Sequence, residues 1–214
     1  VNKSLVDSIS GNDLVSFTRA SSGTFVGADG LIKTTPVNLV TYSEQLDQWG
    51  SGPNTTVTAN AATAPDGTNT ADRLFLPTGG GTYIGSNNFI LNGRTYTGSV
   101  YVKAVTPGTN DQFTLSFGGE SPVNATSKFT ATGEWQRFEA TKTPSLSSAT
   151  RPFVINNEGD TFVADIYVWG AHVEEGSVVN DYIPTTSTIS GAPRFDHDPA
   201  TGESLGLLIE EART

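Results

Sequence analysis

The amino-acid sequence predicts an all-β fold, an antiparallel β-sandwich of jelly-roll type with a β-hairpin arm at each end. Many short segments alternate apolar and polar residues and are rich in Val, Ile, Phe, Tyr and Thr. Glycine (23 residues) and proline (11 residues) separate these segments, as turn residues do. No long stretch repeats its apolar positions with the helical period of about 3.6 residues. Many short strands without helices between them are typical of a two-sheet sandwich or jelly roll.

The clearest strand signals lie in the middle of the chain. The predicted strands are Thr95–Ala104, Gln112–Phe117, Glu134–Thr141, Pro152–Asn156 and Thr161–Ala171. Helical structure is expected only in short pieces, at Ser43–Trp49 and in the Glu-rich stretch Leu207–Arg213.

Each end of the chain carries a hairpin signal. Residues 17–33 are expected to turn at Ala28–Gly30, and residues 193–209 at Asp198–Gly202. The sequence therefore divides into an N-terminal hairpin arm at 1–36, a sandwich at 37–186 and a C-terminal hairpin arm at 187–214.

Composition excludes several classes of function. The net charge of −10 argues against a nucleic-acid partner, because phosphate binding needs a basic surface. No apolar run approaches the roughly 18 residues that cross a bilayer, so no membrane insertion is expected. Cysteine is absent, which removes disulfides and thiol chemistry and is compatible with a bacterial or viral surface protein. The chain begins at Val1 and contains no Met, so we expect it to be part of a longer protein.

The residues needed for catalysis are missing as a set. His172 and His197 are the two imidazoles; we expect His172 to be structural and His197 to be exposed in a turn. The sequence has no nucleophile elbow, phosphate loop or zinc-binding helix. Acidic residues are available for glycoside hydrolysis, but nothing in the sequence sets a spacing between them. The sequence predicts that the chain is not an enzyme.

One acidic stretch near the C-terminal end has two interpretations. Asp196-His-Asp198, followed by Thr201-Gly-Glu203, places oxygen donors close together, as a calcium loop does. It lacks the third Asp or Asn and the flanking helices of an EF-hand loop. A plain Asp-Pro turn is the favoured interpretation.

Several stretches in the middle of the chain resemble a known family. They include the opening Asn38-Leu-Val-Thr-Tyr-Ser43 and its continuation to Trp49, then Gly133-Glu-Trp-Gln-Arg-Phe138, and then Ile166-Tyr-Val-Trp-Gly-Ala-His-Val-Glu174. In this order they resemble a jelly-roll domain common in bacteriophage virion proteins, and the same order of elements occurs in carbohydrate-binding modules of the family 4/9 type. The resemblance implies a phage tail or other virion surface protein and an extracellular location on the virion.

The two arms also resemble segments of phage tail proteins. Ser16-Phe-Thr-Arg-Ala-Ser21 and Pro193-Arg-Phe-Asp-His-Asp-Pro-Ala-Thr-Gly202 carry this resemblance. In those proteins the two hairpins follow each other directly, whereas here the jelly roll lies between them. The resemblance to binding modules further implies a structural calcium ion, for which Glu44 and Asp165 are the nearest matches by position.

Strand alternation suggests where a glycan would bind. Each of three strands has one apolar face, expected in the core, and one face with polar and aromatic groups. An aromatic ring flanked by hydrogen-bonding groups is what a sugar-binding surface needs. We expect an apolar floor made by Trp169, Tyr167 and Tyr101, with Gln112 and Arg137 as hydrogen-bonding partners.

Other interpretations of these aromatic residues remain open. Trp169 and Tyr167 can equally be buried under a loop or an arm. Trp135 and Trp49 are expected in the core, although Trp135 shares the strand parity of Arg137, so one of those two assignments must be wrong.

The sequence therefore predicts a non-catalytic virion module that recognises a glycan or host-surface polysaccharide. One alternative is a purely structural virion domain that binds other virion subunits. Another is the accessory module of a polysaccharide-degrading enzyme. Self-association through the arms is expected, because the hairpins carry apolar residues that isolated hairpins cannot bury. These residues are Phe17, Phe25, Leu31, Phe195, Leu207 and Leu208. The resemblance to phage fibres and spikes, which are commonly trimeric, implies a homotrimer; the alternative is that the two arms pair with each other against their own sandwich.

Overall fold

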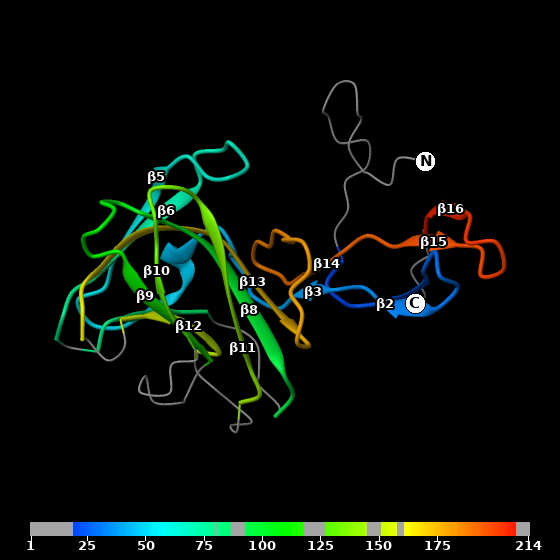
Figure 1. The fold of residues 1–214 in the computed structure, drawn as a ribbon, viewed down its shortest axis with the longest axis horizontal. Coiled ribbons are helices and arrows are strands. Elements are labelled where there is room, and N and C mark those ends of the chain that lie inside the picture. The colour runs from blue at the N-terminus through cyan, green and yellow to red at the C-terminus, as the bar shows by residue number, and fades with distance from the viewer. Residues whose placement is uncertain are drawn as a thin grey trace. The chain divides into compact units, whose positions relative to one another are not determined.

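The computed structural model describes residues 19–79, 81–86, 93–117, 127–144, 151–157 and 161–208 (Figure 1). The chain divides into two compact units. The larger unit runs from Asn38 to Thr188, and the smaller unit combines residues up to Val37 with residues from Ile189 onward. Both arms therefore belong to the same small unit.

The larger unit is built from two antiparallel sheets, each with five strands among the described residues. The β10–β4 sheet has the strand order β10-β9-β12-β7-β4, and the β11–β5 sheet has the order β11-β8-β13-β6-β5. Strands of the first sheet are β4 (Gly50–Ser51), β7 (Tyr83–Gly85), β9 (Gln112–Phe117), β10 (Ser127–Thr130) and β12 (Phe153–Asn156). Strands of the second sheet are β5 (Thr56–Ala62), β6 (Ala71–Leu76), β8 (Tyr96–Ala104), β11 (Gln136–Lys142) and β13 (Ala164–Glu175).

The connections between strands are those of a jelly roll. From β6 to β9 the chain moves to the other sheet at every step, and from β10 to β13 it does so again. Such alternation between two sheets defines the jelly-roll topology and brings distant segments side by side. The predicted all-β sandwich of jelly-roll type with hairpin arms is confirmed.

The core lies between the two sheets and follows the predicted alternation. From the β11–β5 sheet, Val100, Val102, Ile166 and Val168 are completely buried. Phenylalanine and leucine side chains of the β10–β4 sheet, Phe113 among them, meet them from the other side. Each buried side chain of this size stabilises the fold by about 1.5–3 kcal/mol relative to exposure.

Helical structure is shorter than the sequence indicates. The expected helix at Ser43–Trp49 is reduced to one 3₁₀ turn, η1 (Leu46–Gln48). Trp49 is buried, as expected, and its indole N–H donates to the carbonyls of Thr41 and Tyr42 at 3.1 Å. Of the second expected helix, Leu207 lies in a strand instead, and residues 209–213 lie outside the described residues. No described helix has the length and apolar content needed to cross a bilayer.

After β13 the chain turns back across its own sheet. We call residues 176–186 the strap. The buried Asn38 side chain donates to the carbonyl of Ile183 in the strap at 2.8 Å. Thr185 donates its backbone N–H to the hydroxyl of Ser43 at 2.9 Å. Within β13 the register shifts between Trp169 and His172, where Gly170 has a φ of 64° that favours glycine.

The smaller unit contains both predicted hairpins. One pairs β1 (Thr24–Val26) with β2 (Ile32–Thr34), and the other pairs β15 (Phe195–His197) with β16 (Ser204–Leu207). The two-residue strands β3 (Val37–Asn38), which spans the boundary between the units, and β14 (Ser190–Gly191) pair with each other. The hairpins contact each other, since the Val26 N–H donates to the Asp196 carboxylate at 2.6 Å.

Two expectations for the second hairpin have different outcomes. His197 is only 5% exposed and its Nδ1 lies 2.8 Å from the carbonyl oxygen of Val26, so its predicted exposure is wrong. His197 is the last residue of β15 rather than part of the turn, and its ring faces Val26 of β1. The Asp-Pro turn is confirmed, because the Asp198 carboxylate accepts the backbone N–H groups of Ala200 and Thr201.

Candidate functional site

The outer face of the β11–β5 sheet brings together four of the five expected glycan-binding residues. Arg137, Tyr101 and Trp169 are direct cross-strand neighbours on β11, β8 and β13. Tyr167 lies on the same face of β13, opposite Lys103 of β8. Gln112 does not join them: it lies on β9 in the other sheet, whose apolar side chains face the shared core. Alternation assigns a residue to a face of its strand but not to a sheet.

Trp169 does not offer an open ring. It is 5% exposed, and the ring of Tyr182 in the strap lies 4.8 Å from it, centroid to centroid. Tyr101 packs on it from β8 at 5.5 Å. The indole N–H donates to the hydroxyl of Thr70 at 2.9 Å. Trp169 is therefore covered by the strap, which corresponds to the burial alternative rather than to an open floor.

Trp135 belongs to the outer face too, not to the core between the sheets. It is half-buried against the cluster that contains Trp169, and its indole N–H donates to the carbonyl of Thr63 at 3.0 Å. Its predicted core position is therefore wrong, and the placement of Arg137 on the non-core side is correct. Arg137 donates to the hydroxyl of Ser99 at 3.1 Å and to the carbonyl of Asn180 in the strap at 2.8 Å.

The half-buried Tyr167 marks the part of this face that the strap leaves uncovered. Its direct neighbour on β6 is Arg73, which donates two hydrogen bonds to Asp165, at 2.8 and 2.7 Å. Such a fork-to-carboxylate pair fixes both side chains in one plane. Phe75, also half-buried, lies opposite Asp165. We call these four residues, with Lys103, the Tyr167 face.

A hollow with a volume of 260 Å³ lies along the edge of the Tyr167 face. It is lined by Arg73 and Phe75 and by the exposed threonines Thr56 and Thr58 of the edge strand β5. Sequence reasoning missed this part of the site. The signal was available: in β6 the partly exposed Arg73 and Phe75 alternate with buried leucines, which places them on the outer face.

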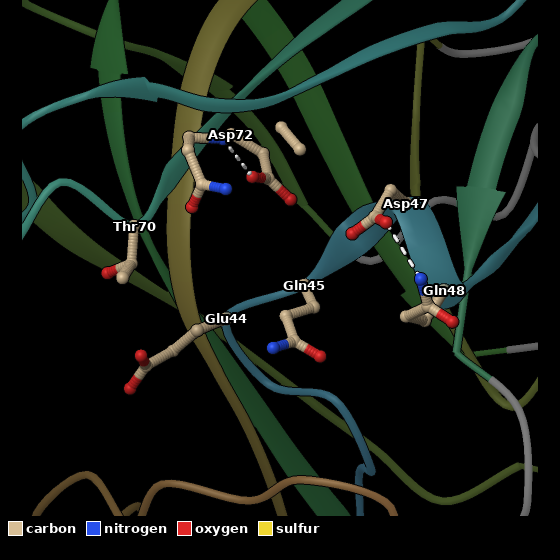
Figure 2. Close-up of a pocket in the computed structure, with 8 residues that line it drawn as sticks. Glu44, Gln45, Asp47, Gln48, Thr70 and Asp72 are labelled. Carbon is tan, nitrogen blue, oxygen red and sulfur yellow. Dashed lines mark hydrogen bonds between the residues drawn. The ribbon is translucent and has the colours of Figure 1, made fainter.

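A second hollow, of 230 Å³, lies beside the 3₁₀ turn (Figure 2). Its lining is polar and includes Glu44, Asp47 and Asp72. Asp72 is buried, and its carboxylate accepts the backbone N–H groups of Leu46 at 2.7 Å and Asn60 at 2.9 Å. Burial raises the pKa of the Asp72 and Glu44 carboxyl groups.

The expected calcium ligands are not brought together. Asp165 is held by Arg73, whereas Glu44 accepts a hydrogen bond from the hydroxyl of Tyr182 at 2.9 Å. Across the part of the chain that the structure describes, no three His, Asp or Glu side chains are grouped as metal ligands. Glu44 and Asp165 therefore do not fit a shared calcium ion.

His172 is structural in position but unusual in its surroundings. It is fully buried, and neither ring nitrogen has a hydrogen-bond partner among the described residues. Its Nε2 lies 3.8 Å from a carboxylate oxygen of Glu174. Burial, and secondarily the charge of Arg137, lower the pKa of His172 to about 4. The imidazole is neutral at pH 7.

Comparison with known proteins identifies no family from sequence. No protein-family model and no curated protein sequence matches the chain. Solved structures with a similar strand arrangement do exist. The CBM22-1 and GH10 modules of an endo-1,4-β-D-xylanase from Clostridium thermocellum, complexed with xylohexaose, give a TM-score of 0.47 at 20% identity, covering 70% of this chain and 30% of that chain.

Two further neighbours have lower scores. The CBM22-1 xylan-binding domain of Paenibacillus barcinonensis Xyn10C gives a TM-score of 0.42 at 10% identity, with 77% of this chain and all (100%) of that chain covered. The enzymatically active domain of tailspike protein 4 from bacteriophage CBA120 gives a TM-score of 0.42 at 16% identity, covering 65% of this chain and 21% of that chain. The chain thus spans less than a third of the xylanase and tailspike chains. Carbohydrate-binding modules recur among these neighbours.

Proposed function

We propose that this chain is a non-catalytic glycan-recognition module, and that the glycan lies along the Tyr167 face. The observation that carries the proposal is the composition of that face. Two partly exposed aromatic rings, Tyr167 and Phe75, stand on adjacent strands beside the Arg73–Asp165 pair. Aromatic rings stack on the C–H faces of sugar rings, while fixed polar groups bind the hydroxyls.

The polar groups of the Tyr167 face suit a hydroxyl-rich ligand. The guanidinium of Arg73 and the carboxylate of Asp165 hold each other at 2.7 Å, so their remaining donor and acceptor sites keep fixed directions. Two exposed threonine hydroxyls, Thr56 and Thr58, line the hollow beside them. Preorganised groups lower the entropic cost of binding.

The proposal includes the absence of catalysis. Asp165 is engaged by Arg73, and Glu174 accepts two hydrogen bonds from Asn180. Glycoside hydrolysis needs two carboxyl groups that flank one bond. Asp165 and Glu174 of the outer face are both engaged by other side chains, so we expect no release of reducing sugar from any bound polysaccharide.

Phage context supports placement on a virion surface. The sequence resemblance of the jelly roll and of both arms to phage virion proteins favours a tail or other surface protein, with a host-surface polysaccharide as the ligand. An accessory module of a polysaccharide-degrading enzyme is the second candidate, and the same Tyr167 face would serve it. A purely structural virion domain would leave the Tyr167 face without a ligand.

Replacing Tyr167 with alanine is expected to weaken glycan binding about tenfold or more. A stacked ring contributes roughly 1–3 kcal/mol, by analogy with stacking on nucleic-acid bases, and about 1.4 kcal/mol corresponds to a factor of ten. An array of bacterial surface and plant polysaccharides would identify the ligand, and calorimetric titration would compare the variants.

Tyr83→Ala is the matched control for Tyr167→Ala, because Tyr83 is a half-buried tyrosine of the other sheet. Its affinity should equal that of the wild type. A chain that binds no polysaccharide on the array, or a folded Tyr167→Ala protein with unchanged affinity, contradicts the proposal.

We also propose that the arms mediate self-association into a trimer. In the smaller unit, Leu31 is 64% exposed, Ile32 77% and Leu205 67%. Phe25, Phe195, Leu207 and Leu208 are only partly buried there, and Phe17 lies outside the described residues. Light scattering at micromolar concentration should give about three times the chain mass of 22.5 kDa. A mass near that of one chain would refute the trimer.

A further inference from the structure

We infer that the strap is an acid-sensitive cover, held closed while His172 is neutral, and that its release uncovers a second aromatic platform. The inference stands on two observations about the outer face of the β11–β5 sheet. One is the burial of His172 without a hydrogen-bond partner. The other is the set of bonds that hold Asn180 in the strap.

Asn180 is anchored by the neighbours of His172. Its backbone N–H and its side-chain amide donate to the two carboxylate oxygens of Glu174, at 2.5 and 2.8 Å. Its carbonyl accepts the hydrogen bond from Arg137. Both anchoring residues lie beside the imidazole: Glu174 is two residues further along β13, and Arg137 bonds to Ser99, the direct neighbour of His172 on β8.

Protonation of His172 would disturb both anchors at once. A charged imidazole attracts the Glu174 carboxylate, whose nearer oxygen lies 3.8 Å from the His172 Nε2 in the closed form. The same carboxylate accepts the hydrogen bonds from Asn180. The charged imidazole repels the Arg137 guanidinium, whose buried Nη2 already lacks a partner. A buried charge that competes for the same carboxylate favours an arrangement in which water reaches it. The strap must move for water to enter.

Titration of the other ionisable groups around His172 does not account for opening of the strap in acid. Glu139 of β11 lies opposite Ser99 and is exposed, so solvent screens it. Tyr182 of the strap lies 6.3 Å from the imidazole, and burial raises its pKa further above neutrality. Burial also raises the pKa of Glu44, which opposes opening as the pH falls. Among His172 and the groups named here, His172 is the one whose pKa shift favours opening of the strap in acid.

The direction of the pH effect follows from the two forms. In the closed form the pKa of His172 is about 4, and in an open, hydrated form it returns towards the ordinary value of 6.5. The open form therefore gains protons first, and it gains population as the pH falls from about 6.5 towards about 4. At pH 5 the gain amounts to roughly 20-fold relative to pH 7.

Opening of the strap would uncover a continuation of the Tyr167 face. Tyr182 covers Trp169, the next outward-facing residue of β13 after Tyr167, and Tyr101 lies beside it. The rings of Trp169 and Tyr101 would then be available for stacking. This consequence for sugar binding rests on the proposed function, whereas the strap's acid sensitivity does not.

Amide hydrogen exchange tests the inference without any ligand. Protection of the Asn180 amide, corrected for intrinsic exchange, should fall about 20-fold between pH 7 and pH 5 in the wild type. The His172→Gln variant, which cannot be protonated, should show no such fall. His197→Gln is the matched control, because it replaces the other buried histidine in the smaller unit and should keep the wild-type response.

Two results would overturn the inference. One is an Asn180 amide whose protection is the same at both pH values in the wild type, or falls equally in His172→Gln. The other needs no variant: it is a pKa near 6.5 for His172 in the closed wild-type protein, measured by NMR titration of the imidazole. Such a value would remove the driving force for opening of the strap.

Discussion

Asn38→Ala is expected to lower the free energy of unfolding of the larger unit by roughly 4–6 kcal/mol. Asn38 is completely buried, and its side chain makes four hydrogen bonds to backbone groups. It donates to the carbonyls of Ala171 and Ile183 at 2.9 and 2.8 Å. It accepts the N–H groups of Val40 and Val173, both at 3.1 Å.

The size of the destabilisation by Asn38→Ala comes from the backbone groups that lose their hydrogen-bond partner. Alanine leaves two buried N–H groups, the buried carbonyl of Ala171 and the partly buried carbonyl of Ile183 without partners. Each costs about 1–3 kcal/mol where no water reaches it, and the total lies near the low end because water reaches Ile183. These groups join the start of the larger unit to β13 and to the strap. A loss of this size approaches the whole stability of a typical domain, which is about 5–15 kcal/mol.

Urea unfolding would measure the effect of Asn38→Ala, with the slope m compared to confirm that the same surface unfolds. Asn38→Asp keeps the acceptor and loses the donors, so it should also destabilise. Asn69→Ala is the control, because Asn69 is exposed and donates one hydrogen bond, to the carbonyl of Asn60. An Asn38→Ala midpoint within error of that control would contradict the assigned role.

Trp169→Ala is expected to cost about 3–5 kcal/mol of stability, as truncation of buried tryptophans does. The ring is buried between Tyr101 and Tyr182, and its N–H bonds to Thr70. For a unit of this size the melting temperature should fall by roughly 6–20 °C. Scanning calorimetry measures this directly.

Trp135→Ala provides the comparison for Trp169→Ala. Trp135 is half-buried at the margin of the same cluster and donates one hydrogen bond to the carbonyl of Thr63. Its loss should lower the melting temperature by less. If Trp169→Ala melted like the wild type but lost sugar binding, the ring would be a binding floor at neutral pH, and the covering role of the strap would be wrong.

Much of the fold could be predicted from local sequence because strand alternation is a local property. The period-two pattern located β8, β9, β11, β12 and β13, and it assigned the core faces of all of these except β12. The pattern also placed Tyr101, Tyr167 and Arg137 on the non-core side of their strands, which the cross-strand register brings together.

The remaining errors arose where long-range packing decides. Alternation does not reveal which sheet a strand joins, and so Gln112 was grouped with residues of the other sheet. It does not reveal what covers an outer face, and so it cannot distinguish a Trp169 ring covered by Tyr182 from an open one. His197 was expected in a turn, but its burial depends on β1, 171 positions away along the chain at Val26.

The most direct test of the glycan-recognition proposal is a titration of isotope-labelled protein with its array-selected oligosaccharide, followed by NMR. At neutral pH, the largest backbone amide shift changes should lie on β6 and β13, at Arg73, Phe75, Asp165 and Tyr167, and along Thr56 and Thr58 of β5. The β10–β4 sheet and the smaller unit should show little change. Shift changes gathered on either of those surfaces, with the Tyr167 face unaffected, would contradict the account.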